Sequence, residues 1–147
     1  MTQIIFDVAH WFLSKASMTY KKLQSLCYYA EAWSEALLGK PIAKNAVFEA
    51  WMHGPINRDL WKEYVRYEWD EIEQTEARPS FPPEKEELLE SVWLTYGKLT
   101  GTQLETLVHR EEPWRKQRLG LSTFESSHKI IQVEDMVKYY QSLYQGD

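Results

Sequence analysis

The amino-acid sequence predicts an all-α fold, built as one domain of about six helices. Apolar residues recur at helical spacing in separate stretches of the 147-residue chain, which is the pattern of amphipathic helices. Capping residues or prolines stand at the borders of these stretches. Because the length is that of one domain, we expect a single domain over residues 1–147.

The second helix, expected over residues 19–38, is the best marked, and a first helix is expected before it over residues 3–15. Thr19 is a favourable N-cap, and Gly39 followed by Pro41 ends the helix. Its apolar stripe consists of Leu23, Leu26, Cys27, Ala30, Trp33 and Leu37. A helix with such a stripe buries it against the rest of the domain.

Residues 43–52 fit either a short β segment or an irregular helical turn. Gly54 and Pro55 then force a bend, because glycine frees the backbone and proline fixes its φ angle. Asn57 can cap a third helix that fades near Tyr67.

Residues 68–83 are expected to form an acidic, proline-containing linker within the domain and to be its most mobile segment. Between residues 63 and 90, ten acidic side chains accompany three basic ones, which gives a local charge of −7. We expect a solvated acidic face here. A docking surface for a basic partner is the alternative.

Three further helices are expected in the second half of the chain. The fourth begins after Pro83, with glutamates that complement the helix dipole. Thr100 and Gln103 form a capping-box pattern for a short fifth helix. The last helix is expected over about residues 133–144.

Composition argues against several classes of protein. No apolar run approaches the roughly 18 residues that span a bilayer, so we expect no membrane partner. Residues 14–62 carry a net charge of only +3, too little for a phosphate-neutralising face, so direct nucleic-acid binding is not expected. Cys27 is the single cysteine. We expect it to be a buried, inert thiol, in a protein of the cytoplasm.

Catalytic and cofactor sites are not predicted. The four histidines lack the spacing of a metal site, and the sequence has no Walker-type, GxGxxG or GxSxG motif. We therefore expect no catalytic residue, no metal, no cofactor and no enzymatic activity. The enzyme alternative requires His53, His109 and Glu112 to converge on a hydrolytic or metal site.

Lys22 is the first of several residues that break local rules. It lies in the first turn of the second helix, where the dipole disfavours a cation. Tyr28 and Tyr29 follow on the same helix and are either interface anchors or core residues with satisfied hydroxyls.

Two further clusters surround prolines. Trp51 and His53 flank the bend at Gly54 and Pro55 and could present contacts to a partner.

In the other cluster, Pro113 should stop the fifth helix and keep Glu112 out of helical geometry. His109 then falls at a helix end, where the dipole favours it. Trp114 begins the next segment.

Taken in order, these clusters resemble the Panacea domain, a SocA-like antitoxin domain that is also found in phage-associated proteins. The matching stretches are residues 8–13, 18–30, 49–56 and 104–114. The most specific elements are Leu-x-x-Leu-x-Tyr-Tyr in the second helix, Ala-Trp-x-x-Gly-Pro in the bend and His-x-x-x-Pro-Trp near residue 109.

The resemblance implies an antitoxin of a toxin–antitoxin system that neutralises a cognate toxin by direct protein binding. In the namesake branch the antitoxin is an adaptor that hands the toxin to a protease, which would add a protease chaperone component as a partner. The alternative is a phage or prophage accessory protein that binds a host factor. The candidate partner-binding or family-signature residues are Lys22, Tyr28, Tyr29, Trp51, His53, Gly54, Pro55, His109, Pro113 and Trp114.

Overall fold

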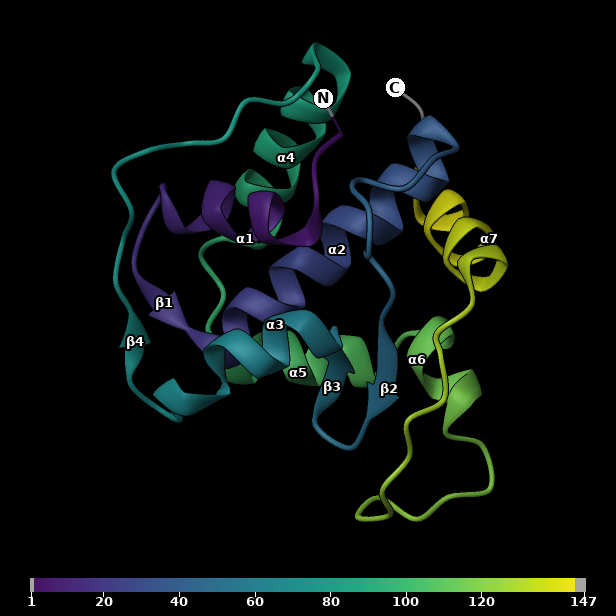
Figure 1. Ribbon diagram of the computed structural model, residues 1–147. Coiled ribbons are helices and arrows are strands. Elements are labelled where there is room, and N and C mark those ends of the chain that lie inside the picture. Colours follow the sequence, from purple (N-terminus) through teal and green to yellow (C-terminus); the bar gives the residue numbers. More distant parts are fainter. Residues whose placement is uncertain (1, 145–147) are drawn as a thin grey trace.

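The computed structural model describes residues 2–144 and confirms a predominantly helical fold (Figure 1). The described helices are α1 (Ile5–Leu13), α2 (Tyr20–Leu38), α3 (Arg58–Tyr64), α4 (Pro83–Tyr96), α5 (Gly101–His109), α6 (Glu112–Gln117) and α7 (Val133–Leu143), with a 3₁₀ helix η1 (Val65–Tyr67) after α3. The strands are β1 (Met18–Thr19), β2 (Glu49–Trp51), β3 (Gly54–Ile56) and β4 (Glu71–Ile72). The outermost positions of the expected domain, 1 and 145–147, lie outside the described residues.

Helix α2 runs through the middle of the fold and contacts α1, α4, α5 and α7 (Figure 1). Its ends follow the local sequence. The Thr19 side chain accepts a hydrogen bond from the Lys22 N–H, and Gly39 closes the helix with a left-handed φ of 70°. Thirteen of its 19 residues are buried, so α2 is a core helix and not an amphipathic surface helix.

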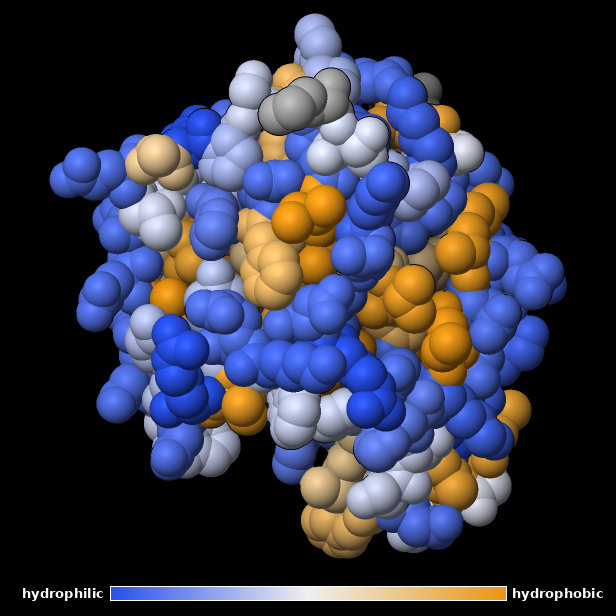
Figure 2. Space-filling view, viewed as in Figure 1, coloured by the Kyte–Doolittle hydropathy of each residue, from blue (hydrophilic) through white to orange (hydrophobic). Residues whose placement is uncertain are grey.

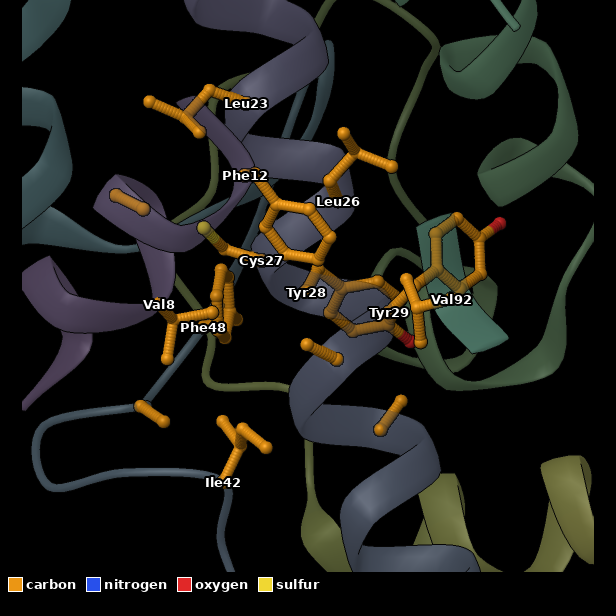
Figure 3. Packing of buried hydrophobic residues seen from close by; sticks show 14 of the residues in the cluster. Val8, Phe12, Leu23, Leu26, Cys27, Tyr28, Tyr29, Ile42, Phe48 and Val92 are labelled. Carbon is orange, nitrogen blue, oxygen red and sulfur yellow. The ribbon is translucent and has the colours of Figure 1, made fainter. Parts of the chain in front are cut away.

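The core packs around α2 (Figure 3). Figure 3 shows Val8 and Phe12 of α1 and Phe48 from the segment before β2 turned towards the same face of α2. Cys27 is fully buried, as predicted, and burial raises the pKa of its thiol.

Two short antiparallel pairs accompany the helices. Strand β1 pairs with β4, so that Met18 lies opposite Ile72. Strand β2 lies within the ambiguous segment 43–52 and forms a hairpin with β3. Gly54 has a φ of 141° in this hairpin, a conformation that side chains with a Cβ rarely adopt.

Segment 68–83 runs along one edge of the fold (Figure 1). It contains β4, and two of its residues bind the main chain at the end of α1. The Thr75 N–H donates to the Leu13 oxygen at 3.1 Å, and Gln74 Nε2 donates to the Ser14 oxygen at 3.0 Å. Within residues 2–144, none of the helices has both the length and the apolar character needed to cross a bilayer.

The prediction for Pro113 was wrong in one respect. Glu112 is not outside helical geometry: it is the first residue of α6, and Pro113 follows it in the first turn. Proline is tolerated there because the first turn needs no N–H donor and its φ already fits a helix. The extended residue is Glu111, with φ −98° and ψ 141°. The described chain therefore has seven α-helices, where about six were expected.

Two carboxyl groups, Glu31 and Glu35, are buried one turn apart in α2, and Glu31 is only 2% exposed. The Ile42 N–H donates to Glu31 Oε1 at 2.9 Å. Burial, together with the hydrogen bond to Glu35, raises the pKa of Glu31 to about 9. Glu31 therefore keeps its proton in the folded protein at neutral pH.

This protonated carboxyl predicts how stability depends on pH. The unfolded chain releases the Glu31 proton above the ordinary pKa of 4.5, whereas the folded chain holds it up to about pH 9. Stability should therefore fall as pH rises through this window. In Glu31→Gln the fall should be smaller, by up to about 1 kcal/mol per pH unit. Chemical denaturation of both proteins at pH 5.5 and pH 8 measures this change in the free energy of unfolding. Parallel pH profiles for the two proteins would contradict the assignment.

Candidate functional site

The β2–β3 hairpin carries four of the predicted residues: Trp51, His53, Gly54 and Pro55. Glu49 in β2 accepts hydrogen bonds from Trp51 Nε1 and Arg58 Nε, each at 2.8 Å. Partial burial raises the pKa of Glu49, but the two hydrogen bonds outweigh it and hold the pKa below the ordinary value. Glu49 is therefore ionised and fixes the Trp51 ring in place.

Helix α6 and the turn after it hold the hairpin from behind. Trp114 Nε1 donates to the main-chain oxygen of Trp51 at 2.9 Å, and Arg118 donates to the oxygen of Ala50 at 3.1 Å. The His109 ring stacks on Trp114, with ring centroids 4.1 Å apart and planes inclined by 12°. The His-x-x-x-Pro-Trp element thus positions the hairpin. It is not an exposed contact patch, since Trp114 is buried and His109 half-buried.

Glu105 in α5 joins α2 to the tip of the hairpin. It accepts from Lys21 Nζ at 2.6 Å and lies 3.2 Å from His53 Nδ1. Burial raises its pKa, but the bonds from Lys21 and His53 lower it overall. His109 Nε2 is 3.8 Å from Glu105, too far for a hydrogen bond. Burial lowers the pKa of His109, so this ring is neutral near pH 7.

The enzyme alternative requires Glu112 to meet the two histidines. His53 and His109 both approach Glu105 instead. Glu112 is exposed at the start of α6 and, within residues 2–144, forms no hydrogen bond or ion pair with either histidine. No group of three or more His, Cys, Asp or Glu side chains in the described part of the chain is arranged to hold a metal ion.

Lys22 has a structural partner. Its Nζ donates to the main-chain oxygen of Gly97 at the end of α4, at 2.5 Å, and lies 5.6 Å from the centre of the Trp93 ring. Cations are favoured at a helix C-terminus, so the α4 end compensates for the unfavourable position of Lys22 at the start of α2. Lys22 therefore ties these two helices together.

Tyr28 and Tyr29 belong to the core. The Tyr29 hydroxyl donates to Glu111 at 2.8 Å, the Tyr140 hydroxyl donates to the same oxygen at 2.7 Å, and the hydroxyls of Tyr28 and Tyr140 are 3.2 Å apart. Burial raises the pKa of Glu111. This buried network joins α2, the start of α6 and α7.

Sequence reasoning did not single out Glu105 or Glu111 as site residues. A signal existed for Glu105, because it stands four residues before His109 and this spacing puts two side chains on one helix face. Glu111 had no local signal, since its partners Tyr29 and Tyr140 are far away in sequence.

A groove of about 510 Å³ opens beside the hairpin, and we call it the tryptophan groove. It is bounded by the start of α2, the hairpin, α3 with η1, and residues 126–128. Its apolar and aromatic lining comprises Tyr20, Trp51, Met52, Pro55, Ile56, Trp61, Val65, Trp69 and His128. Trp51 and Trp61 are half-buried with ring centroids 5.8 Å apart, whereas Trp69 is 81% exposed.

Concave, largely apolar surfaces with a few polar groups are the usual form of binding sites, so the tryptophan groove is the candidate site of this domain. The chain is thus a predominantly helical domain that carries a candidate binding groove. In agreement with this, the family model described as antitoxin SocA-like, Panacea domain matches residues 23–115. This is more than half of the chain, and the protein belongs to that family, which confirms the resemblance seen in the sequence. No curated protein and no solved structure matches the chain.

The matched range contains the hairpin, the exposed Trp69 and the His109–Trp114 element. Lys22 lies one residue before it. The predicted residues therefore divide into two groups in space. Trp51, His53, Gly54 and Pro55 line the groove, whereas the others hold the elements around it.

A substitution in the buried tyrosine network tests whether the predicted residues outside the groove stabilise the fold. In Tyr29→Phe, the carboxylate of Glu111 loses one of its two tyrosine donors while remaining buried, so the protein should be destabilised by roughly 1–3 kcal/mol. The matched control is Tyr64→Phe, because Tyr64 is also buried and its hydroxyl forms no hydrogen bond within residues 2–144. Urea denaturation, followed by circular dichroism, measures the free energy of unfolding of both variants. An equal loss of stability in the two variants would show that the hydrogen bond network does not stabilise the fold.

Proposed function

We propose that the protein neutralises a cognate toxin by binding it directly, with the tryptophan groove as the contact surface. Membership of the antitoxin SocA-like family supports the antitoxin role. The observation that carries the choice of surface is the exposure of Trp69 at the edge of a groove that the hairpin residues also line.

Trp69 has the properties of an interface anchor. Tryptophan is enriched among the few residues that dominate binding energy. Trp69 is 81% exposed, so its apolar ring surface faces water in the free protein, and burying that surface against a partner is favourable. The preceding residue, Glu68, has a φ of 53°, which costs energy in a residue other than glycine. Such strain concentrates where a side chain must be presented for function.

The proposal also includes the cellular location of the protein and the fate of the bound toxin. The buried single thiol of Cys27 fits a reducing compartment, and we place the protein in the cytoplasm. Delivery of the bound toxin to a protease is implied by the namesake branch of the family. It would shorten the life of the toxin in cells, whereas simple blocking would leave the toxin amount unchanged.

The substitution Trp69→Ala tests the proposed surface. Co-expressed with the product of the neighbouring reading frame, the wild-type protein should relieve growth arrest, and Trp69→Ala should not. Binding measured by calorimetry should weaken by about 30-fold or more, the effect of removing an interface anchor. Because Trp69 is exposed, unfolding should change little.

Leu94→Ala is the matched control, because Leu94 is 74% exposed on α4 and does not line the groove. It should bind and neutralise like the wild type. Growth arrest that persists with wild-type protein present would sink the antitoxin proposal. Neutralisation by Trp69→Ala at the wild-type level would sink the groove as the contact surface. A neighbouring product that causes no arrest, together with binding to a host protein, would favour the accessory-protein alternative.

A further inference from the structure

An acidic strip continues from the rim of the tryptophan groove. It spans residues 68–76 and contains five acidic residues and no basic one. Its acidic residues, all exposed, are Glu68, Asp70, Glu71, Glu73 and Glu76. Glu68 and Trp69 line the groove itself. From there the strip passes into β4 at the left edge of the molecule in Figure 1, and the same edge is mostly hydrophilic in Figure 2.

The acidic side chains of the strip are exposed on either side of a buried residue of β4. Ile72 in β4 is buried, with 3% exposure, opposite Met18 of β1. Glu71, the other residue of β4, and Glu73, which follows the strand, flank Ile72 and are both exposed. Glu71 also accepts a hydrogen bond from Ser17 Oγ at 2.7 Å. Two positions along a strand are roughly 6–7 Å apart. Cations on successive turns of a helix, with Cβ atoms about 5–6 Å apart, match this spacing.

The charges of the strip are largely uncompensated. Within residues 2–144, Glu68, Asp70 and Glu73 form no ion pair. Lys21 is the cation that lines the groove; its Nζ is bonded to Glu105 at 2.6 Å and lies 5.7 Å from the centre of the Trp69 ring. Arg58, whose guanidinium lies 5.8 Å from the centre of the Trp51 ring, is bonded to Glu49. The acidic strip adjoins the groove at Glu68 and Trp69.

We propose that the occupant of the tryptophan groove is a basic amphipathic helix of the partner protein. Its apolar side chains enter the groove beside Trp61 and Trp69, and its Lys and Arg side chains lie along the acidic strip. This inference rests on the proposed function, because it states the chemistry of the partner segment that the groove receives. Opposite charge beside an apolar groove gives both orientation and a faster encounter.

The same charges disfavour other occupants. An acidic segment would meet Glu68 in the groove and the other four carboxylates of the strip beyond it, and like charges across an interface are costly. Nucleic acid would be repelled for the same reason. A purely apolar segment would fill the groove and leave the strip without a role.

A peptide assay tests the proposal whatever the identity of the toxin. The probe is a labelled 16-residue helical peptide with Leu on one face and Lys on the other. The first comparison peptide has Glu in place of each Lys, and the second has Ser in place of each Leu. Fluorescence anisotropy with the full-length protein should show binding of the Lys/Leu peptide, and binding at least about tenfold weaker for each comparison peptide.

Variants of the protein separate specific docking from general attraction to a negatively charged protein. The triple variant Glu68→Gln, Asp70→Asn, Glu73→Gln should weaken binding of the Lys/Leu peptide by about tenfold and reduce its salt dependence. The matched control Glu87→Gln, Glu112→Gln, Glu134→Gln removes the same charge from exposed sites elsewhere and should stay within about twofold of wild type. Trp69→Ala should also weaken binding.

The outcomes distinguish the inference from the proposed function. Absence of peptide binding, equal binding of the Glu and Lys peptides, or equal losses in the two triple variants would overturn the basic-helix occupant. If Trp69→Ala nevertheless abolished toxin neutralisation, the groove would remain the toxin surface and only the chemistry of its occupant would be wrong.

Discussion

The carboxylate of Glu111 accepts hydrogen bonds from Tyr29 of α2 and Tyr140 of α7. A buried carboxylate without donors is strongly destabilising, so these bonds determine where the chain between α5 and α6 can lie. Helix α6 begins at the next residue and carries Trp114, whose indole binds the main chain of Trp51. The position of the hairpin, and with it the tryptophan groove, therefore depends on a hydrogen bond network in the core.

This chain of contacts explains how a family signature can include residues that are buried behind the groove. His109 and Trp114 stack behind the hairpin, and Lys22 caps α4. Their substitution would alter binding indirectly, through the position or stability of the groove. Trp69 is different, because its ring is 81% exposed and lies outside the core, with the Lys21 Nζ over its face. Loss of binding without loss of stability is accordingly expected at the groove edge, and loss of both at the residues behind it.

Local sequence patterns predict the elements whose signals lie within one or two turns. The Thr19 cap and Gly39 termination of α2, and the capping box of α5, are observed as expected. The β1–β4 pairing joins segments more than 50 residues apart, and no local pattern carries it. Helix α6 is missed because a proline that ends one helix can equally stand in the first turn of the next. Likewise the convergence of His53 on Glu105 depends on how the hairpin packs against α5.

The central claim is that the tryptophan groove receives the toxin while the buried signature residues hold it in shape. Hydrogen–deuterium exchange of the protein alone and in complex with the neighbouring gene product tests this most directly. We expect protection on binding in residues 51–56, 61–69 and 126–128, which surround the groove, with α4 little changed. Protection confined to α4 and α7, with the groove segments exchanging as in the free protein, would contradict the claim.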